Sequence, residues 1–112
     1  MNTTLKRLIG IDQLENGVAK KVCVAGVAPI AVYKCGDEYF ATQDKCTHAQ
    51  ASLSEGWVEG FEVFCPVHDA RFDIRDGRAL CFPATEPLAT YKVVLEGGYV
   101  SIEVGEAGDE VR

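Results

Sequence analysis

The feature that most restricts the fold of this chain is the way its histidines follow its cysteines. Cys46 lies two residues before His48, Cys65 lies three residues before His68, and residues 49–64 separate the two pairs. The chain has no other histidine. Thiolate sulfur and imidazole nitrogen are common metal ligands in proteins. The fold is therefore expected to bring two segments together around one metal centre, with these four side chains as ligands.

The composition indicates one globular domain, residues 1–112, because 47% of the residues are hydrophobic and the length suits a single core. The net charge of −6 argues against nucleic-acid binding, which needs a basic surface. An acidic surface either steers docking onto a basic protein or simply keeps the protein dissolved. No apolar run is long enough to cross a bilayer, and residues 1–12 lack the apolar core of a signal peptide. We therefore expect a cytoplasmic protein without a membrane partner.

Five cysteines are present, and the two pairs account for only Cys46 and Cys65. A reducing compartment makes structural disulfides unfavourable. The other three, Cys23, Cys35 and Cys81, are therefore expected to be free thiols.

Short apolar or alternating segments separated by turns predict a fold made almost entirely of β-strands. We expect strands at residues 20–24, 28–33, 38–42, 61–64, 71–74, 78–81, 91–95 and 99–104. Glycine-containing turns at residues 36–37, 76–77 and 97–98 predict hairpins. Residues 11–15 form the one short helical candidate, and the acidic tail, residues 105–112, is expected to fray. This pattern is typical of an all-β sandwich or barrel.

Both cysteine–histidine pairs fall in loops between the expected strands, which makes a coincidental arrangement the least favoured interpretation. A structural zinc site uses the same ligand atoms, but it usually pairs cysteine with cysteine and histidine with histidine. Here each loop supplies one of each. A [2Fe–2S] cluster with two histidines on one iron fits this arrangement better, because each loop can give its cysteine to one iron and its histidine to the other.

Residues 46–77 resemble the cluster-binding region of Rieske ferredoxins, the small electron carriers of bacterial aromatic-ring dioxygenase systems. The likeness includes the segment from Phe72 to Gly77 and continues through residues 79–88 to Tyr91. It implies a Rieske-type antiparallel β-sandwich with a cluster-binding subdomain of two loops, within about residues 44–84. It also implies that the inner, buried iron is held by Cys46 and Cys65. The outer iron would be held by His48 and His68.

The chain lacks features of the high-potential members of that family. Ala51 and Val67 stand where those proteins have the two cysteines of a bracing disulfide. Ala70 and Phe72 stand where they have a serine and a tyrosine, whose hydroxyls donate to the cluster sulfurs. Such donors stabilise the reduced cluster and raise its potential. We therefore expect a potential near the lower end of the Rieske range, about −150 mV.

The resemblance implies a one-electron carrier rather than an enzyme. No histidine is left for an oxygen-activating iron site, and no glycine-rich loop precedes a helix as a nucleotide site requires. The carrier would be a monomer that accepts an electron from an NAD(P)H-dependent flavoprotein reductase. It would pass that electron to the terminal oxygenase. A small accessory subunit of a larger reductase is the alternative.

The expected docking face is the tip that carries His48 and His68. Neighbouring side chains that are candidates for its rim are Gln50, Trp57, Phe82 and Pro83. For Trp57, packing in the core is the favoured interpretation.

Overall fold

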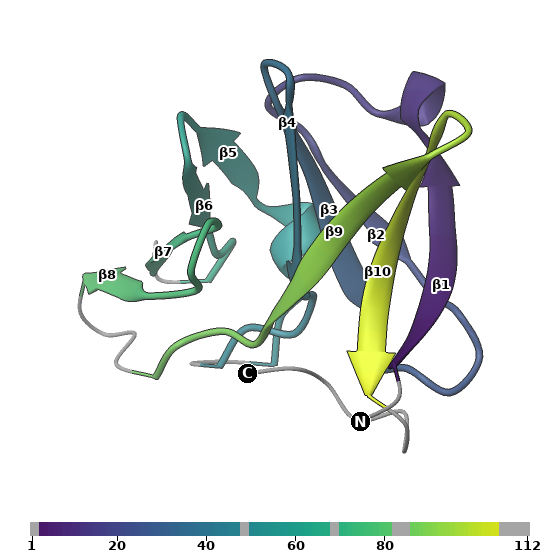
Figure 1. The fold of residues 1–112 in the computed structure, drawn as a ribbon. Helices are drawn as coiled ribbons and strands as arrows, with labels where there is room; N and C mark the ends of the chain where they lie inside the picture. Colours follow the sequence, from purple (N-terminus) through teal and green to yellow (C-terminus); the bar gives the residue numbers. More distant parts are fainter. Residues whose placement is uncertain (1–2, 48–49, 68–69, 82–85, 106–112) are drawn as a thin grey trace.

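Ten strands in two antiparallel sheets make up the part of the chain that the computed structural model describes, residues 3–47, 50–67, 70–81 and 86–105 (Figure 1). The larger sheet has the order β1-β10-β9-β4-β3-β2, with bounds Thr3–Gly10, Tyr99–Gly105, Thr90–Glu96, Glu38–Gln43, Ile30–Cys35 and Ala19–Val22. The smaller sheet has the order β5-β6-β7-β8, with bounds Trp57–Glu59, Glu62–Phe64, Arg71–Asp73 and Ala79–Cys81. Two single 3-10 turns are η1, Ile11–Gln13, and η2, Leu53–Glu55.

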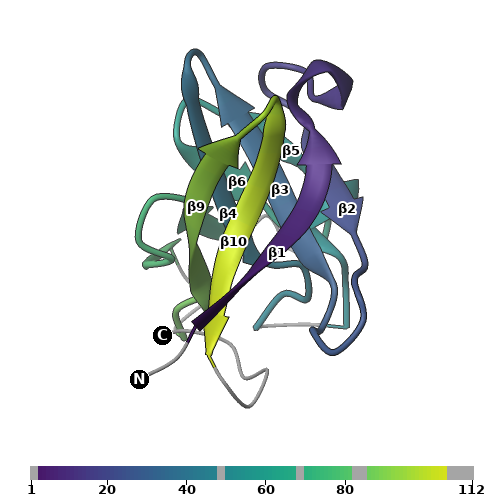
Figure 2. The same cartoon turned by 45° about the vertical axis from the view of Figure 1, so that its right-hand side comes forward.

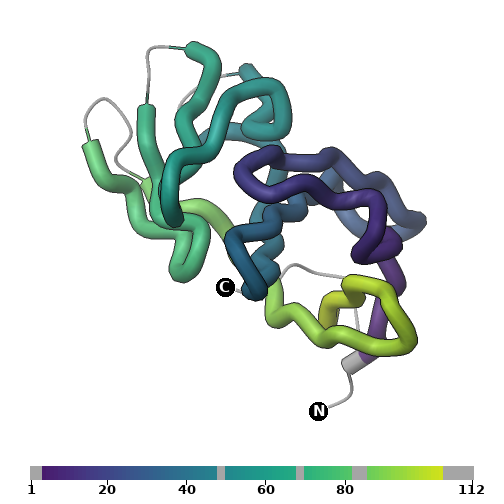
Figure 3. The backbone as a smooth tube through the Cα atoms, turned by 90° about the horizontal axis from the view of Figure 1, so that it is seen from above, coloured from purple at the N-terminus to yellow at the C-terminus, as the bar shows by residue number. Residues whose placement is uncertain are grey.

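The larger sheet curls, so that β1, β10 and β9 form one layer in front of β2, β3 and β4 (Figure 2). The smaller sheet stands beside it as a separate lobe, as the view from above makes clear (Figure 3). The all-β sandwich predicted from the sequence is thus confirmed. Among the residues that the structure describes, no helix is long and apolar enough to cross a membrane.

Strand β3 explains how the two lobes are joined, because both of its faces are buried. Successive side chains of a strand point to opposite sides. Ile30 and Val32 enter the core of the curled sheet, while Ala31 and Tyr33 enter a second core shared with the smaller sheet. All four are fully buried. This continuous apolar run therefore divides one core from the other.

The predicted strands all occur, each within two residues of its expected ends. Strands β1 and β5 were not predicted. In the part of the chain that the structure describes, β1 pairs along one side only, with β10, and keeps Leu5 exposed. Because Leu5 is exposed, the apolar residues of β1 do not all lie on one buried face, and the strand signal in its sequence is weak. Strand β5 has three residues, too few for a periodic signal. The predicted helical segment is only the short η1 turn, and the predicted frayed tail lies outside the described residues from residue 106 onward.

The β7–β8 hairpin is organised around one buried carboxylate. Asp73 accepts hydrogen bonds from the backbone N–H of Arg75 at 2.9 Å and from its guanidinium at 3.0 and 2.8 Å. The same guanidinium lies 4.4 Å from the ring centre of Phe61, which packs in a T-shaped arrangement with Phe40 of β4. The hairpin is thereby connected to the larger sheet.

The stability of the fold should fall in acid through Asp73. Hydrogen bonds from Arg75 lower the pKa of this carboxyl below its ordinary value, against the opposing effect of burial. A lowered pKa in the folded state contributes stability above the unfolded pKa of about 3.9, and this contribution is lost as the pH falls through the folded pKa. In thermal unfolding, Asp73→Asn should therefore have a lower Tm than the parent at pH 7. The difference should shrink below about pH 4; a constant difference would contradict this account.

Candidate metal centre

Two loops of equal span are closed by the same hydrogen bond. The N–H of Cys46 donates to the carbonyl of Ala51 at 2.9 Å, and the N–H of Cys65 donates to the carbonyl of Ala70 at 2.7 Å. Each cysteine therefore lies at the neck of a loop that returns to it five residues later. Strand pairing continues outward from the second neck, where Phe64 of β6 is opposite Arg71 of β7. Beside the first neck, Lys45 and Ser52 form an isolated antiparallel bridge, so backbone pairing holds both cysteines in place.

The two predicted cysteine ligands lie together in the core between the sheets. Cys46 and Cys65 are both buried, with 2% and 0% of their surface exposed. Burial raises the pKa of the Cys65 thiol to about 11; the N–H of Val67 opposes this shift, and a hydrogen bond with the Cys46 side chain adds to it. Without a cation, two buried thiolates side by side are unfavourable. A bound metal reverses this, because it deprotonates a coordinating thiol. The pair therefore suits a bound metal centre.

The predicted histidine ligands, His48 and His68, lie outside the described residues. In the part of the chain that is described, no three potential ligand side chains gather at one place. The structure therefore brings together the cysteine half of the ligand set, and the histidine half stays a prediction.

A third segment, residues 86–89, is fastened to the first loop by side chains that the sequence analysis did not single out. The hydroxyl of Thr47 donates to the carbonyl of Glu86 at 2.8 Å. Gln43 receives a hydrogen bond from the N–H of Ala89 at 2.7 Å and donates from its side-chain amide to the carbonyl of Lys45 at 2.6 Å. The only sequence signal for these contacts was the polar residue Thr47 between the two predicted ligands of the first loop. Thr47 and Gln43 hold the loop in place from outside the ligand set.

The second loop also depends on a close backbone approach. A Cβ at Gly56 would overlap the carbonyl oxygen of Phe64 and lie 3.3 Å from Cδ of Pro66. Both residues adjoin Cys65. Glycine at this position therefore lets the chain after η2 pass directly beside the neck of the second loop.

Trp57 is not a core residue, which corrects the interpretation favoured from the sequence. Its side chain is 43% exposed, and its ring stacks on Phe64 at a centroid distance of 5.0 Å. Stacking across the β5–β6 strand pair stabilises the indole although the indole is not buried. Of the other proposed rim residues, Gln50 is exposed, while Phe82 and Pro83 lie outside the described residues.

None of the three cysteines outside the pairs is in a disulfide. Cys23 is exposed, and Cys35 and Cys81 are partly exposed. The Cys35 thiol donates to the carbonyl of Gly60 at 3.4 Å. Neither Ala51 nor Val67 can form a disulfide, so the two loops are held by hydrogen bonds and packing instead.

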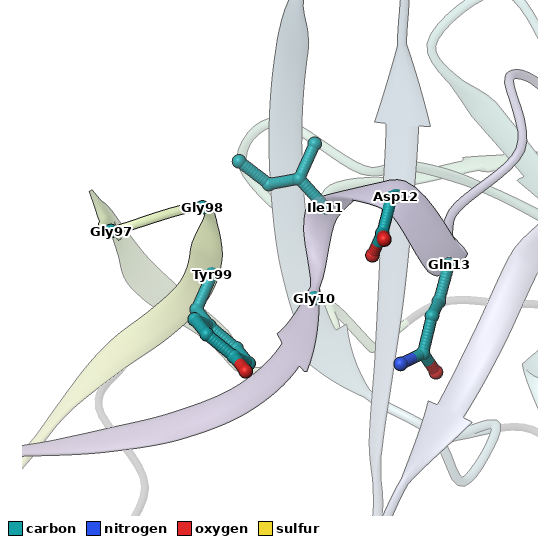
Figure 4. Close-up of a pocket in the computed structure, with 7 residues that line it drawn as sticks. All are labelled: Gly10, Ile11, Asp12, Gln13, Gly97, Gly98 and Tyr99. Atoms are coloured by element: carbon teal, nitrogen blue, oxygen red, sulfur yellow. The ribbon is translucent and has the colours of Figure 1, made fainter.

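A groove of about 570 Å³ lies far from these loops, where β1 ends and β9 turns into β10 (Figure 4). It is lined by Gly10, Ile11, Asp12, Gln13, Gly97, Gly98 and Tyr99. The ring of Tyr99 is covered on one face by Arg7, at 4.3 Å from its centre. None of the described residues that line this groove is a cysteine or histidine, so it supplies no predicted ligand.

Comparison with known proteins agrees with this site. The model of the Rieske [2Fe-2S] domain matches residues 5–92. The chain is 44% identical over 97 residues to the 3-phenylpropionate/cinnamic acid dioxygenase ferredoxin subunit of Photorhabdus laumondii, covering 86% of this chain and 90% of that one. It is 49% identical over 82 residues to the anthranilate 1,2-dioxygenase ferredoxin subunit of Burkholderia cepacia, covering 73% and 76%.

A solved structure shows the same fold. In a complex of reduced oxygenase and oxidized ferredoxin of carbazole 1,9a-dioxygenase, one chain superimposes with a TM-score of 0.85 and 35% identity, covering 97% of both chains. This chain belongs to the Rieske [2Fe-2S] domain family. It is an electron-transfer protein of the ferredoxin type, and its cofactor is a Rieske-type [2Fe–2S] cluster.

Proposed function

We propose that this protein is the ferredoxin of a bacterial aromatic-ring dioxygenase system. It carries one electron at a time from an NAD(P)H-dependent flavoprotein reductase to the terminal oxygenase. The observation that supports this most is the meeting of buried Cys46 and Cys65 at the necks of two matched loops, in a chain that is 44% identical to a dioxygenase ferredoxin subunit. The alternative, a permanent accessory subunit of a reductase, has no comparable support in sequence identity.

Within this proposal, the cluster supplies a one-electron redox centre when bound, and the chain's residues place and insulate it. Cys46 and Cys65, which are buried in the core, would hold the inner iron. His48 and His68 would hold the outer iron, and the loops to which they belong would meet each partner. Gln43 and Thr47 keep residues 86–89 beside the first loop. A rigid setting of this kind limits the structural change that accompanies each electron.

We place the carrier in the cytoplasm, as a monomer. None of its five cysteines is in a disulfide, which suits a reducing compartment. A carrier that must visit two partners in turn needs small contacts, of less than about 1,200 Å² in total, rather than a permanent interface. Size-exclusion chromatography of the holoprotein tests the monomer directly.

Electron delivery to a purified oxygenase tests the function. The chemically reduced protein should reduce the oxygenase component of a 3-phenylpropionate or anthranilate dioxygenase and support product formation in proportion to its concentration. Electron paramagnetic resonance of the same reduced sample should show an average g below that of all-cysteine clusters. A colourless, silent protein that contains zinc would overturn the proposal, as would a correctly loaded protein that reduces neither oxygenase.

The midpoint potential should be about −150 mV, at the lower end of the Rieske range. Ala70 and Phe72 are fully buried and carry no hydroxyl that could donate to a cluster sulfur. Introducing a hydroxyl by Phe72→Tyr should raise the potential, while Phe72→Leu, which adds no donor, is the matched control. Redox titration followed by visible absorbance measures all three proteins. A parent value above zero would contradict this expectation.

A further inference from the structure

One row of side chains crosses the outer face of the smaller sheet from edge to edge. Trp57 is paired with Phe64, Phe64 with Arg71, and Arg71 with Cys81, so each of the four strands contributes one residue. The guanidinium of Arg71 lies 5.7 Å from the ring centre of Phe64, and the indole of Trp57 stacks on the same ring. We call Trp57, Phe64 and Arg71 the aromatic row.

The aromatic row faces away from the core. The residues next to it along the strands, Val63 and Phe72, are completely buried in the core between the sheets. Because side chains alternate along a strand, the aromatic row lies on the opposite face. Trp57 is the only tryptophan of the chain and leaves 43% of its surface exposed. An exposed indole of this size is unusual on a protein that has a core available for it.

The aromatic row also borders the cluster loops. Phe64 is bonded directly to Cys65, and Arg71 follows Ala70, the residue that closes the second loop. A protein seated on the row would therefore adjoin the second loop, which the proposed function places at the surface where electrons leave.

Charges around the aromatic row define what fits it. The charge of Arg71 is balanced by Glu62, at 3.1 Å. Glu59, two residues after Trp57 on β5, is exposed and forms no ion pair with another described residue. Glu55, two residues before Trp57, is exposed too but lines a hollow that it shares with Lys21 and Lys45. The surface is thus an apolar centre with an acidic border at Glu59. Its complement is an apolar patch bordered by lysine or arginine.

We propose that the aromatic row is a docking surface for the oxygenase component, which presents an apolar patch with a basic border to it. This rests on the proposed function and extends the contact from the histidine tip along the smaller sheet. Trp57 is the anchor, because a partly exposed aromatic side chain held rigid by stacking loses little conformational freedom when a partner covers it.

The single tryptophan provides a direct test by binding. The oxidised protein, labelled with 5-fluorotryptophan, has one fluorine resonance, and it is titrated with the purified oxygenase component of a 3-phenylpropionate dioxygenase. The resonance should shift or broaden as the complex forms, and high salt should reverse the change. Serum albumin at the same concentration should leave it unmoved.

Variants separate docking from cluster chemistry. Trp57→Ala should weaken the affinity for the oxygenase at least about tenfold, as loss of an interface anchor does, while the paramagnetic resonance spectrum and midpoint potential stay unchanged. Trp57→Phe should retain most of the affinity. Leu95→Ala is the matched control, because Leu95 is 49% exposed but lies at the end of β9 remote from the cluster loops.

The outcomes separate this proposal from the one it rests on. Binding that leaves the fluorine resonance unmoved, or Trp57→Ala with parental affinity, overturns the docking surface and leaves the ferredoxin function standing. A parent protein that neither binds nor reduces the oxygenase overturns both.

Discussion

Replacing Cys65 with alanine should give a protein that holds no iron–sulfur cluster. Cys65 is completely buried against Cys46, so no other thiol or water can take its place as an iron ligand without opening the core. The purified variant should lack visible colour, and iron and sulfide analysis should find less than about a tenth of one cluster per chain, since each thiolate is one of only four ligands. Loss of the metal also removes its contribution to folding, so Tm should fall.

The matched control is Cys23→Ala, which makes the same chemical change at an exposed cysteine. It should keep a full cluster and the parental spectrum. A coloured Cys65→Ala protein with intact Rieske resonance would show that Cys65 is not a ligand. A colourless Cys23→Ala protein would show that the assay reports general damage rather than ligand loss.

Gly77→Ala should be the most destabilising single-methyl substitution in the β7–β8 hairpin. Gly77 has a φ of +81°, which alanine adopts at a cost of roughly 1–2 kcal/mol. A Cβ there would also overlap the carbonyl oxygen of Leu88, whose own N–H donates to the carbonyl of Gly77 at 2.8 Å. The hairpin and residues 86–89 would have to separate. We expect a loss of more than about 3 kcal/mol in chemical unfolding.

Gly98→Ala isolates the part of this loss that comes from close approach. Gly98 has nearly the same φ, +83°, but nothing lies within 4 Å of a Cβ placed on it. It should lose only the conformational cost, roughly 1–2 kcal/mol. Because residues 86–89 are tied to Thr47, Gly77→Ala should also loosen the cluster and speed its loss in air, which Gly98→Ala should not. Equal losses of stability in the two variants would contradict the close-approach argument.

The strand pattern was predictable because each predicted strand combines an apolar stretch with a nearby turn. β3 and the β9–β10 hairpin are clear examples, with a continuous apolar run in one and two glycines in the other. β5 was missed because three residues do not establish a period. The prediction that Trp57 packs in the core was wrong because a large apolar ring generally favours burial. Its actual position depends on stacking with Phe64, seven residues later and on the paired strand.

The sequence alone determined the kind of protein this is, since the likeness of residues 46–77 to Rieske ferredoxins is a local property of the chain, and the family match bears it out. It also determined the all-β class, because alternation and turns are local properties of the chain. Only the tertiary structure decided which face of the smaller sheet meets solvent and that Gln43 and Thr47 fasten the third segment to the first loop. The two hydrogen bonds join residues 39 and 46 positions apart. Local patterns carry no information about pairs that only packing brings together.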